Sequence, residues 1–366
     1  MTKKIRVIGA ALVTTLWLGI AVLAWVQQPK EISDAERRKL AQFPELTTES
    51  IMNGQFMTGF EDYTLDQFPG RDTFRQLKAL FHYKALGQKD NNGIFFHDGY
   101  AAKLEYPLNE TSVDYAMSKF QYIYDSYLKE TGSSVVMAVV PDKSYYLQDA
   151  GYLTMDYEKL FSTVREKMPY ATHVDLTGTL KLEDYYHTDT HWRQEALLPA
   201  AGQLCQALGV DIPDKSDFAV TEVQRPFYGV YYGQAALPMD AEPMYVMKNT
   251  LLERCTVKNF ENGKVTKVYD MTKLGSRELY DVFLSGPVSM LEIKNPNAST
   301  DRELIVFRDS FGSSMVPLLV QDYATVTMID IRYVSSQILD RLIEFHGQDV
   351  LFLYSTLVLN NSNTMR

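Results

Sequence analysis

Apolar and polar positions in residues 91–366 follow two alternating patterns. Short uninterrupted apolar runs are typical of buried parallel strands, and they alternate with stretches in which apolar residues recur at helical spacing. Strands are predicted at residues 94–96, 134–140, 172–176, 304–307, 324–331 and 350–354. Helices are predicted at residues 113–128, 157–168, 192–208, 311–320 and 335–345. This alternation predicts an α/β domain with a parallel sheet that is covered by helices on both faces.

Between about residues 211 and 300 the helical period disappears. Short β-prone pieces at residues 219–223, 228–232, 264–269 and 289–293 are separated by Pro, Gly and Asn. Such pieces are typical of short strands joined by turns. We interpret this stretch as a β-rich insertion within the α/β domain rather than as an independent domain.

The N-terminus has the pattern of a membrane-targeting element. Lys3, Lys4 and Arg6 precede an uncharged stretch of 20 residues, Val7 to Val26. A cleavable signal has an apolar region of only about 7–15 residues and a cleavage site flanked by small residues. About 20 residues span a hydrocarbon core of roughly 30 Å, so residues 1–30 are predicted to be an uncleaved signal anchor, with a cleaved signal as the alternative.

The basic flank of this anchor is expected to stay in the cytoplasm, which places the rest of the chain outside the cell membrane. Residues 31–90 contain apolar residues at helical spacing and are predicted to be a juxtamembrane helical segment. The α/β domain would then cover residues 91–366. The protein is therefore expected to be a single-pass membrane protein with an extracytoplasmic domain.

Composition supports a globular protein and excludes one class of partner. The chain is 46% hydrophobic and 22% charged, with a formal net charge of −10. Because residues 1–30 contribute +4, the remainder carries −14, which argues against nucleic acid as a partner. Cys205 and Cys255 have no metal-type spacing, and the sequence leaves open whether they pair.

The strongest chemical signal is the segment 185–192, Tyr-Tyr-His-Thr-Asp-Thr-His-Trp. Asp189 precedes His191 by two residues, and on extended backbone such residues point the same way. A carboxylate bound to Nδ1 of an imidazole fixes the tautomer and leaves Nε2 free to accept a proton. This pair would be half of a system that activates a serine nucleophile.

Ser310 is the candidate nucleophile, because it follows the predicted strand 304–307 and opens the predicted helix 311–320. Its hydroxyl would stand at the C-terminal end of a parallel strand, where open α/β sheets bind ligands. The N–H groups of Ser310 and Phe311 at the start of the helix would be free to hold an oxyanion.

Two other interpretations of these residues stay open. Asp309 or Ser310 also fits a helix N-cap, since Asp and Ser are preferred there. His187, Asp189 and His191 occupy alternate positions, so on a strand they would share one face and could bind a metal ion there. No fourth ligand is obvious nearby. The preferred interpretation contains no metal, and no cofactor is predicted.

Supporting residues are expected at the same edge of the sheet. Lys143 follows the predicted strand 134–140, and Arg332 and Tyr333 follow the predicted strand 324–331. We expect Lys143 to orient an anionic group or to form a salt bridge, Arg332 and Tyr333 to support the site from the same edge, and Trp192 to pack at the wall of the site.

The segment 185–192 resembles the signature of the DHHW-motif proteins of bacteria, with Thr190 at the second position of Asp-His-His-Trp. Its Asp-Thr-His-Trp also resembles the motif of the related alginate O-acetylation proteins, which have an SGNH-hydrolase-like domain. Other stretches agree with the DHHW pattern, namely residues 36–40 with 43–44, 68–72, 141–143, 308–311 and 329–333. The resemblance covers nearly the whole chain outside the anchor and is loosest across residues 211–300.

This resemblance implies an SGNH-hydrolase-like, flavodoxin-like parallel sheet and an Asp189–His191 pair that serves a Ser310 nucleophile. The implied reaction is ester hydrolysis or acetyl transfer on a cell-surface or secreted polysaccharide, with a membrane partner delivering the acyl group in the transferase case. In ordinary SGNH hydrolases the serine comes first in the chain, whereas here the pair precedes it, as in the alginate relatives. Arg308 also replaces the glycine of a Gly-Asp-Ser motif.

Two alternatives of other classes remain. One is a catalytically inactive glycan-binding or scaffold protein of the cell envelope, and the other is a metal-dependent hydrolase that uses His187, Asp189 and His191.

Overall fold

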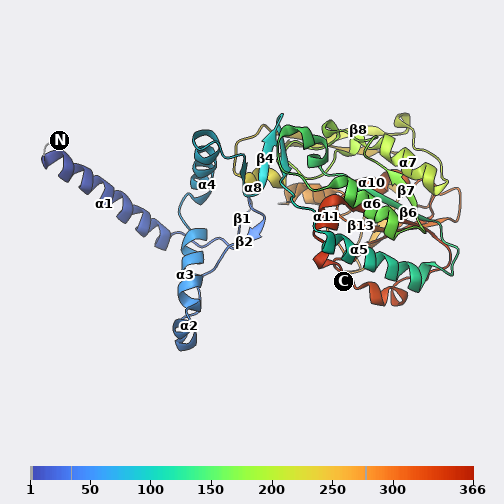
Figure 1. Ribbon diagram of the computed structural model, residues 1–366, viewed down its shortest axis with the longest axis horizontal. Coiled ribbons are helices and arrows are strands. Elements are labelled where there is room, and N and C mark those ends of the chain that lie inside the picture. The colour runs from blue at the N-terminus through green and yellow to red at the C-terminus, as the bar shows by residue number, and fades with distance from the viewer. Residues whose placement is uncertain (1–2, 34, 277) are drawn as a thin grey trace. The chain divides into compact units, whose positions relative to one another are not determined.

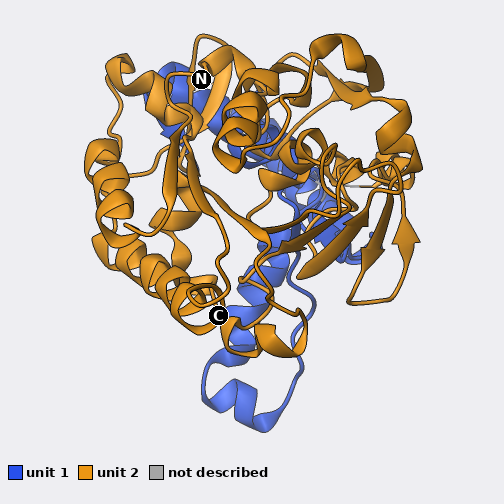
Figure 2. Ribbon diagram, turned by 90° about the vertical axis from the view of Figure 1, so that its right-hand side faces the viewer, with its two compact units in different colours: residues 1–92, 232–238 blue, residues 93–231, 239–366 orange. Residues whose placement is uncertain are grey.

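The computed structural model describes residues 3–33, 35–276 and 278–366. The chain forms two compact units, one of residues 1–92 with 232–238 and one of residues 93–231 with 239–366 (Figure 2). The stretch 211–300 therefore divides its residues between the two units. All candidate site residues belong to the second unit.

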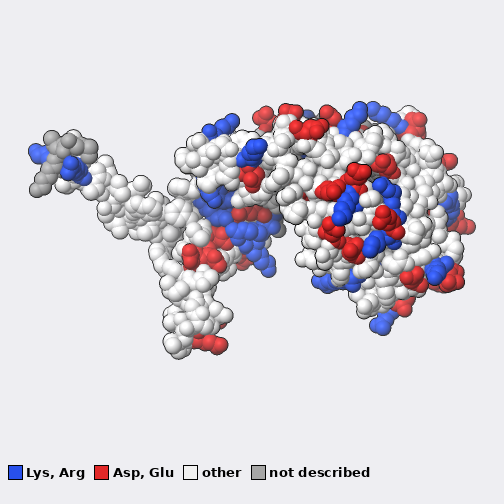
Figure 3. Space-filling view, viewed as in Figure 1, with Lys and Arg blue, Asp and Glu red and all other residues white. Residues whose placement is uncertain are grey.

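The first unit begins with a long apolar helix, α1 (Lys3–Val26). Residues Lys4–Val26 have a mean hydropathy of 2.3 over the most apolar window, and none of that window is buried. In the space-filling view this helix is a white column with its basic residues at the N-terminal end (Figure 3). One N-terminal helix of this kind fits a single-pass anchor or a signal peptide.

The rest of the first unit is mainly helical (Figure 1). Its elements are the hairpin β1 (Ile32–Ser33) and β2 (Arg38–Lys39), then α2 (Thr48–Met52), α3 (Gln55–Asp66) and α4 (Arg71–Leu80), a π-helical turn at Phe81–Ala85, and β3 (Asp90–Asn91). Gly70 precedes α4 with φ 70°, a left-handed conformation that glycine adopts without steric cost.

The second unit is built around an eight-stranded sheet in the order β11-β10-β12-β14-β13-β15-β6-β7. The strands are β6 (Val135–Val140), β7 (Thr172–Asp175), β10 (Thr256–Asn259), β11 (Val265–Thr266), β12 (Met290–Lys294), β13 (Glu303–Arg308), β14 (Thr325–Ile329) and β15 (Asp349–Ser355). The neighbours β14, β13, β15, β6 and β7 are parallel, and the other three strands extend one end of the sheet antiparallel.

The order of the five parallel strands explains why the acid–base pair precedes the serine in the chain. If β13 is counted first and the chain is followed through β14 and β15 and then to β6 and β7, the spatial order becomes 2-1-3-4-5. That is the flavodoxin-like order. The sheet is thus a circularly permuted flavodoxin-like sheet, in which the serine follows strand 1 and the acid–base pair follows strand 5.

Helices cover both faces of this sheet, as predicted. One face of β6 buries Val136, Ala138 and Val140 in a core with residues of α7 (Leu198–Leu208) and α10 (Gly312–Met315). The alternate residues of β6 are buried against α5 (Glu110–Ile123), α6 (Tyr157–Lys167) and α11 (Thr356–Asn360). Successive side chains of a strand point to opposite faces of the sheet. Because both faces of β6 are buried, all of its residues are apolar. The predicted α/β fold class is confirmed.

The remaining elements lie outside the main sheet. They are the hairpin β4 (Ile94–His97) and β5 (Tyr100–Lys103), the ribbon β8 (Ala219–Phe227) and β9 (Glu242–Lys248), and the short helices α8 (Val230–Ala235) and α9 (Thr250–Arg254).

Three predicted elements differ most clearly from the structure. The helix predicted at residues 192–208 begins only at Leu198, because Trp192 pairs with Tyr185 in an antiparallel bridge. The helix predicted at 335–345 is a short 3₁₀ turn, Ser336–Arg341, before the chain turns at Gly347 into β15. The strand predicted at 228–232 is replaced by the start of α8.

Candidate active site

The loop that carries Asp189 and His191 follows β7 and doubles back on itself. Tyr185 bridges Trp192, and the N–H of Tyr186 donates to the carbonyl of His191 at 3.0 Å. All three aromatic side chains are fully buried. Burial of these rings fixes the two ends of the loop in the core, so that the residues between them have little freedom.

Asp189 is a fully buried carboxylate that is held by donors on both of its oxygens. Its Oδ1 accepts from Nδ1 of His191 at 2.6 Å and from the N–H of the same residue at 3.0 Å. Its Oδ2 accepts from the N–H of Val230 at 2.8 Å. Hydrogen bonds to an ionised acceptor are among the stronger ones in proteins, and here they orient both the carboxylate and the imidazole.

The start of α8 lies directly against this carboxylate. A Cβ on Gly229 would lie 2.2 Å from Cβ of Asp189, so only glycine fits this approach. The first N–H groups of a helix have no partner within the helix. Here those of Gly229 and Val230 donate to the Thr188 hydroxyl and to Asp189, which explains why a helix replaces the predicted strand.

Ser310 lies two residues beyond the end of β13 and is half-buried. Its Oγ is 2.8 Å from Nε2 of His191. The structure thus brings Asp189, His191 and Ser310 together from segments that are 119 residues apart in the sequence. A carboxylate, an imidazole and a hydroxyl in this order have the geometry in which a serine hydroxyl can lose its proton to an imidazole.

The N-cap interpretation of this segment is wrong, because the residue that precedes α10 is Phe311 and it has no side-chain cap. The nearby side chain that binds backbone N–H groups is that of Asp309. Its Oδ1 accepts from the N–H of Phe311 at 3.0 Å, and its Oδ2 accepts from the N–H of Ser355 at 2.7 Å. The N–H of Phe311 is therefore engaged, contrary to the expectation that it is free for an oxyanion. Within residues 3–33, 35–276 and 278–366, the N–H of Ser310 has no hydrogen-bond partner.

Tyr280 contacts the imidazole and was not predicted. Its ring stacks on His191 with centroids 3.8 Å apart and 6° between the planes, and its hydroxyl lies 2.6 Å from Oγ of Ser314. Trp192 also donates to Oγ of Ser314, at 2.9 Å, and packs edge-on against Phe311. Trp192 thus packs beside the site, whereas nothing in the sequence distinguished Tyr280 from the other 23 tyrosines.

Glu242 is a second contributor that sequence reasoning missed. Its carboxylate accepts from the N–H groups of His187 and Thr188 at 3.0 and 2.9 Å, and from the Thr188 hydroxyl at 2.9 Å. It lies 55 residues beyond His187 and 54 beyond Thr188, at the start of β9, so no local pattern could connect it to the loop.

Lys143 is buried beneath the loop. Its Nζ donates to the carbonyl oxygens of Tyr186 and His187 at 2.9 and 3.3 Å and lies 5.0 Å from the centre of the Tyr231 ring. Burial lowers the pKa of its ammonium to about 7. Only 2% of the surface of Lys143 is exposed, and its ammonium supports the loop backbone. The expected salt bridge is not formed in the described part of the chain.

Arg332 and Tyr333 lie elsewhere on the sheet edge. Arg332 donates to both oxygens of Asp330, at 2.9 and 2.6 Å, and its guanidinium lies 5.5 Å from the centre of the Tyr333 ring. Both residues line a cavity with the C-terminal residues 363–366. Among the described contacts, neither residue reaches His191 or Ser310.

His187 does not join the other two candidate metal ligands. Its ring packs against Tyr100, with centroids 4.2 Å apart and the planes at 71°. Among the described residues no group of three or more His, Cys, Asp and Glu side chains is arranged to hold a metal ion. Cys205 and Cys255 are both free and buried, and burial raises the pKa of each thiol.

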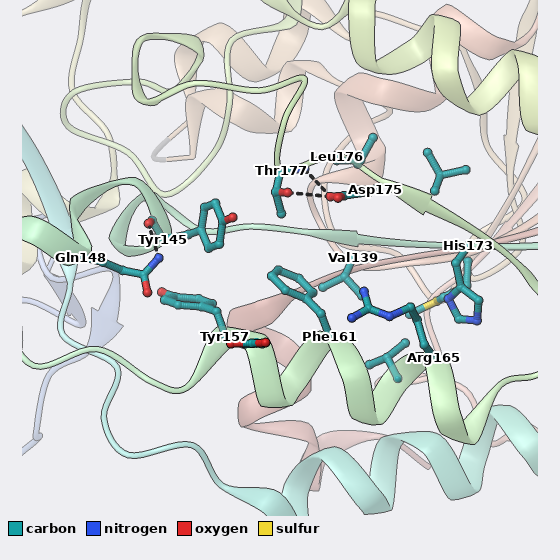
Figure 4. A pocket seen from close by; sticks show the side chains of 14 residues that line it. Val139, Tyr145, Gln148, Tyr157, Phe161, Arg165, His173, Asp175, Leu176 and Thr177 are labelled. Carbon is teal, nitrogen blue, oxygen red and sulfur yellow. Dashed lines mark hydrogen bonds between the residues drawn. The ribbon is translucent and has the colours of Figure 1, made fainter.

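A cavity of about 490 Å³ lies between β7 and α6. Tyr145, Tyr157, Phe161, Arg165 and His173 are among the residues that line it (Figure 4). None of the residues that line it belongs to the group of Asp189, His191 and Ser310, so this cavity is separate from the candidate active site.

The chain is similar to known proteins in sequence and in fold. The family model for DHHW proteins matches residues 170–329. No curated protein sequence matches the chain. A solved DHHW family protein from Eubacterium siraeum superposes with a TM-score of 0.56 at 19% identity, covering 75% of this chain and 94% of that one.

Two structures of Bacillus cereus PatB1 are similar in fold as well. One, which carries a sulfonyl adduct, has a TM-score of 0.56 at 19% identity and covers 73% of this chain and 95% of that chain. The other has the same TM-score and identity and covers 73% and 96%. The resemblance to DHHW proteins is therefore confirmed: this chain matches the DHHW family across residues 170–329 and shares the fold of a solved DHHW family protein.

Proposed function

We propose that the protein is an extracytoplasmic, membrane-anchored serine esterase or O-acetyltransferase that acts on a cell-surface or secreted polysaccharide. Ser310 is the nucleophile, His191 is the general base and acid, and Asp189 orients the imidazole. The observation that carries this proposal is the pair of contacts made by His191, 2.6 Å from Nδ1 to Asp189 Oδ1 and 2.8 Å from Nε2 to Ser310 Oγ.

In the first half-reaction, Oγ of Ser310 attacks the carbonyl carbon of an acyl ester while its proton passes to Nε2 of His191. The carbonyl oxygen becomes an oxyanion, and the N–H of Ser310 is a candidate to stabilise it. The bond to the leaving alcohol then breaks, and the alcohol takes the proton from Nε2. An acyl group remains on Ser310.

In the second half-reaction, Nε2 takes a proton from an acceptor hydroxyl, whose oxygen attacks the acyl carbon. Collapse of this intermediate returns the proton to Oγ and releases the acylated acceptor. Water as acceptor gives hydrolysis and a free acid, whereas a sugar hydroxyl gives O-acetylation. The choice between esterase and transferase therefore depends on which acceptor reaches the acyl-enzyme.

The burial of Asp189 supports its role. The imidazole becomes positively charged when it takes the serine proton, and a nearby carboxylate stabilises that charge. Solvent does not reach Asp189, so the attraction is screened less than it would be at the surface. The donors on both oxygens hold the carboxylate in place during the reaction.

The proposed location and the proposed substrate are supported by other observations. The apolar helix α1, with its basic N-terminal flank, supports anchoring with the second unit outside the membrane. The polysaccharide substrate and an acyl-donor partner in the membrane are suggested by the resemblance to DHHW and alginate O-acetylation proteins.

A fluorophosphonate probe on the detergent-solubilised full chain tests the nucleophile. We expect covalent labelling of the wild type and its loss in Ser310→Ala, while Ser313→Ala, a change to a buried neighbour, keeps it. Labelling that survives Ser310→Ala would contradict the proposal by showing another nucleophile. A wild type that is never labelled would contradict it too and would favour an inactive glycan-binding protein. Comparing acetate release with acetyl transfer on acetylated glycans then separates esterase from transferase.

A further inference from the structure

Helix α4 and the π-helical turn that continues it expose an apolar stripe. Phe74, Leu77 and Phe81 recur at helical spacing, and 52%, 57% and 57% of their surfaces are exposed. A helix on a soluble protein turns its apolar stripe towards the core. Here the stripe is largely exposed: Phe74 meets the ring of Phe68 edge-on with centroids 5.3 Å apart, yet more than half of the surface of each of the three side chains remains exposed.

The opposite face of α4 is held against the first unit by charged groups, which fixes the orientation of the helix. Arg71 lies 2.5 Å from the Glu36 carboxylate, and Arg75 lies 3.4 Å from it. Arg75 also donates to the carbonyl of Gly233 at 3.0 Å, and Ala79 is fully buried. Turning the apolar stripe inward would break these ion pairs and expose Ala79.

Basic residues flank the stripe. At about 100° per residue, Lys78 falls beside Phe74 and Phe81 on α4, and Lys84 lies in the π-helical turn three residues beyond Phe81. Both lysines lie on exposed stretches of the helix. An apolar stripe bordered by lysines is typical of a helix that lies in the interface of a membrane with anionic lipids.

The start of α4 is also tied to the exit of the apolar helix α1. Gln67, three residues before Gly70, is buried, and its side chain accepts from the N–H of Lys30 and donates to the carbonyl of Lys30, both at 2.9 Å. The side chain of Gln27 donates to the backbone carbonyl of Gln67 at 2.5 Å. The helix with the apolar stripe therefore begins where the predicted membrane span ends.

We propose that α4 and its π-helical turn lie in the plane of the outer leaflet of the membrane that α1 spans. Phe74, Leu77 and Phe81 insert among the acyl chains, and Lys78 and Lys84 bind anionic phospholipid headgroups. The partner of this surface is thus the lipid bilayer. This inference rests on the membrane anchoring proposed above and is independent of the chemistry at Ser310.

Fluorescence quenching in nanodiscs tests this placement on the full chain. Single NBD labels are attached to Leu77→Cys and, as a matched control on the adjacent exposed position, to Gln76→Cys; the native cysteines are buried and protected from labelling. A third label at Leu16→Cys reports on α1. With brominated lipids in phosphatidylcholine and phosphatidylglycerol, we expect strong quenching at Leu16 and Leu77 and at least twofold less at Gln76.

The outcomes separate this inference from the proposed function. Quenching at Leu16 without quenching at Leu77 overturns the in-plane helix while leaving the anchor intact, and equal quenching at Leu77 and Gln76 overturns it too. Replacing both Lys78 and Lys84 by Gln should reduce quenching at Leu77 only in discs that contain phosphatidylglycerol. Fluorophosphonate labelling of Leu77→Cys should equal that of the wild type, because Leu77 takes no part in the chemistry at Ser310.

Discussion

The ring of Tyr280 lies flat on the imidazole of His191, with 3.8 Å between the centroids and 6° between the planes. The hydroxyl of Tyr280 is in turn 2.6 Å from Oγ of Ser314. This stack limits rotation of the imidazole about its own axis, so Tyr280 is a positioning residue for the contacts of His191 with Asp189 and Ser310.

Loss of the stack should slow the chemistry at Ser310, and the Tyr280→Phe variant separates this effect from a general loss of stability. Aromatic pairs contribute about 0.5–1.5 kcal/mol beyond area burial, so Tyr280→Ala should slow fluorophosphonate labelling at least several-fold. Tyr280→Phe keeps the ring and should restore most of the rate, with a stability loss of about 1 kcal/mol from the lost hydrogen bond. Equal rates for both variants would contradict a positioning role.

The role of the Asp189 carboxylate can be tested with a side chain of the same shape. Asp189→Asn should slow labelling of Ser310 by roughly 10³–10⁴, because an amide cannot hold the required tautomer or stabilise the imidazolium. The second-order rate constant of labelling measures this effect, and a melting temperature within a few degrees of the wild type confirms that the fold survives. A rate within tenfold of the wild type would remove Asp189 from the proposed mechanism.

A methyl group at Gly229 should disturb the site through Asp189. Its Cβ would overlap Asp189, whose Cβ would be 2.2 Å away, so Gly229→Ala must push α8 or the carboxylate aside. We expect a destabilisation of about 1–3 kcal/mol and a loss of labelling. Gly275→Ala is the matched control, since a Cβ there meets nothing within 4 Å, and it should be neutral in both assays.

Lys143 should make stability depend on pH. Burial lowers its pKa in the folded chain to about 7, from 10.5 in the unfolded chain, so the unfolded chain binds more protons between these values. Stability should therefore rise as pH increases from about 7 towards 10, by at most about 1.4 kcal/mol per pH unit. Chemical unfolding of the wild type and of Lys143→Met measures the slope, which should be smaller in the variant; equal slopes would refute the assignment.

The sequence was informative where the physical signal was local. Uninterrupted apolar runs such as that of β6 located the parallel strands, because a strand buried on both faces needs apolar side chains at every position. Asp189 and His191 were found from their two-residue spacing, and Ser310 from its place between a strand and a helix. Their roles remain proposals, although the structure brings them together.

The parts that were missed depend on contacts between distant segments. Tyr280 and Glu242 reach the loop 185–192 from the stretch 211–300, where the sequence has no helical period. The strand expected at residues 228–232 does not form, because the N–H groups of Gly229 and Val230 donate to the side chains of Thr188 and Asp189. The burial of Lys143 was missed as well, since nothing near it in the sequence indicates that the loop lies over it.

The permuted strand order has a consequence for how such a site can diversify. The segment that joins His191 to Ser310 in the chain also supplies three residues around the loop 185–192. Gly229 lies against Asp189, Glu242 accepts from the backbone of His187, and Tyr280 stacks on the imidazole of His191. Closing a tethered segment of this kind costs only about 0.6 kcal/mol more for each doubling of its length. Related chains can therefore lengthen or rebuild this one segment, and with it the surroundings of Asp189 and His191, while the strands β7 and β13 stay unchanged.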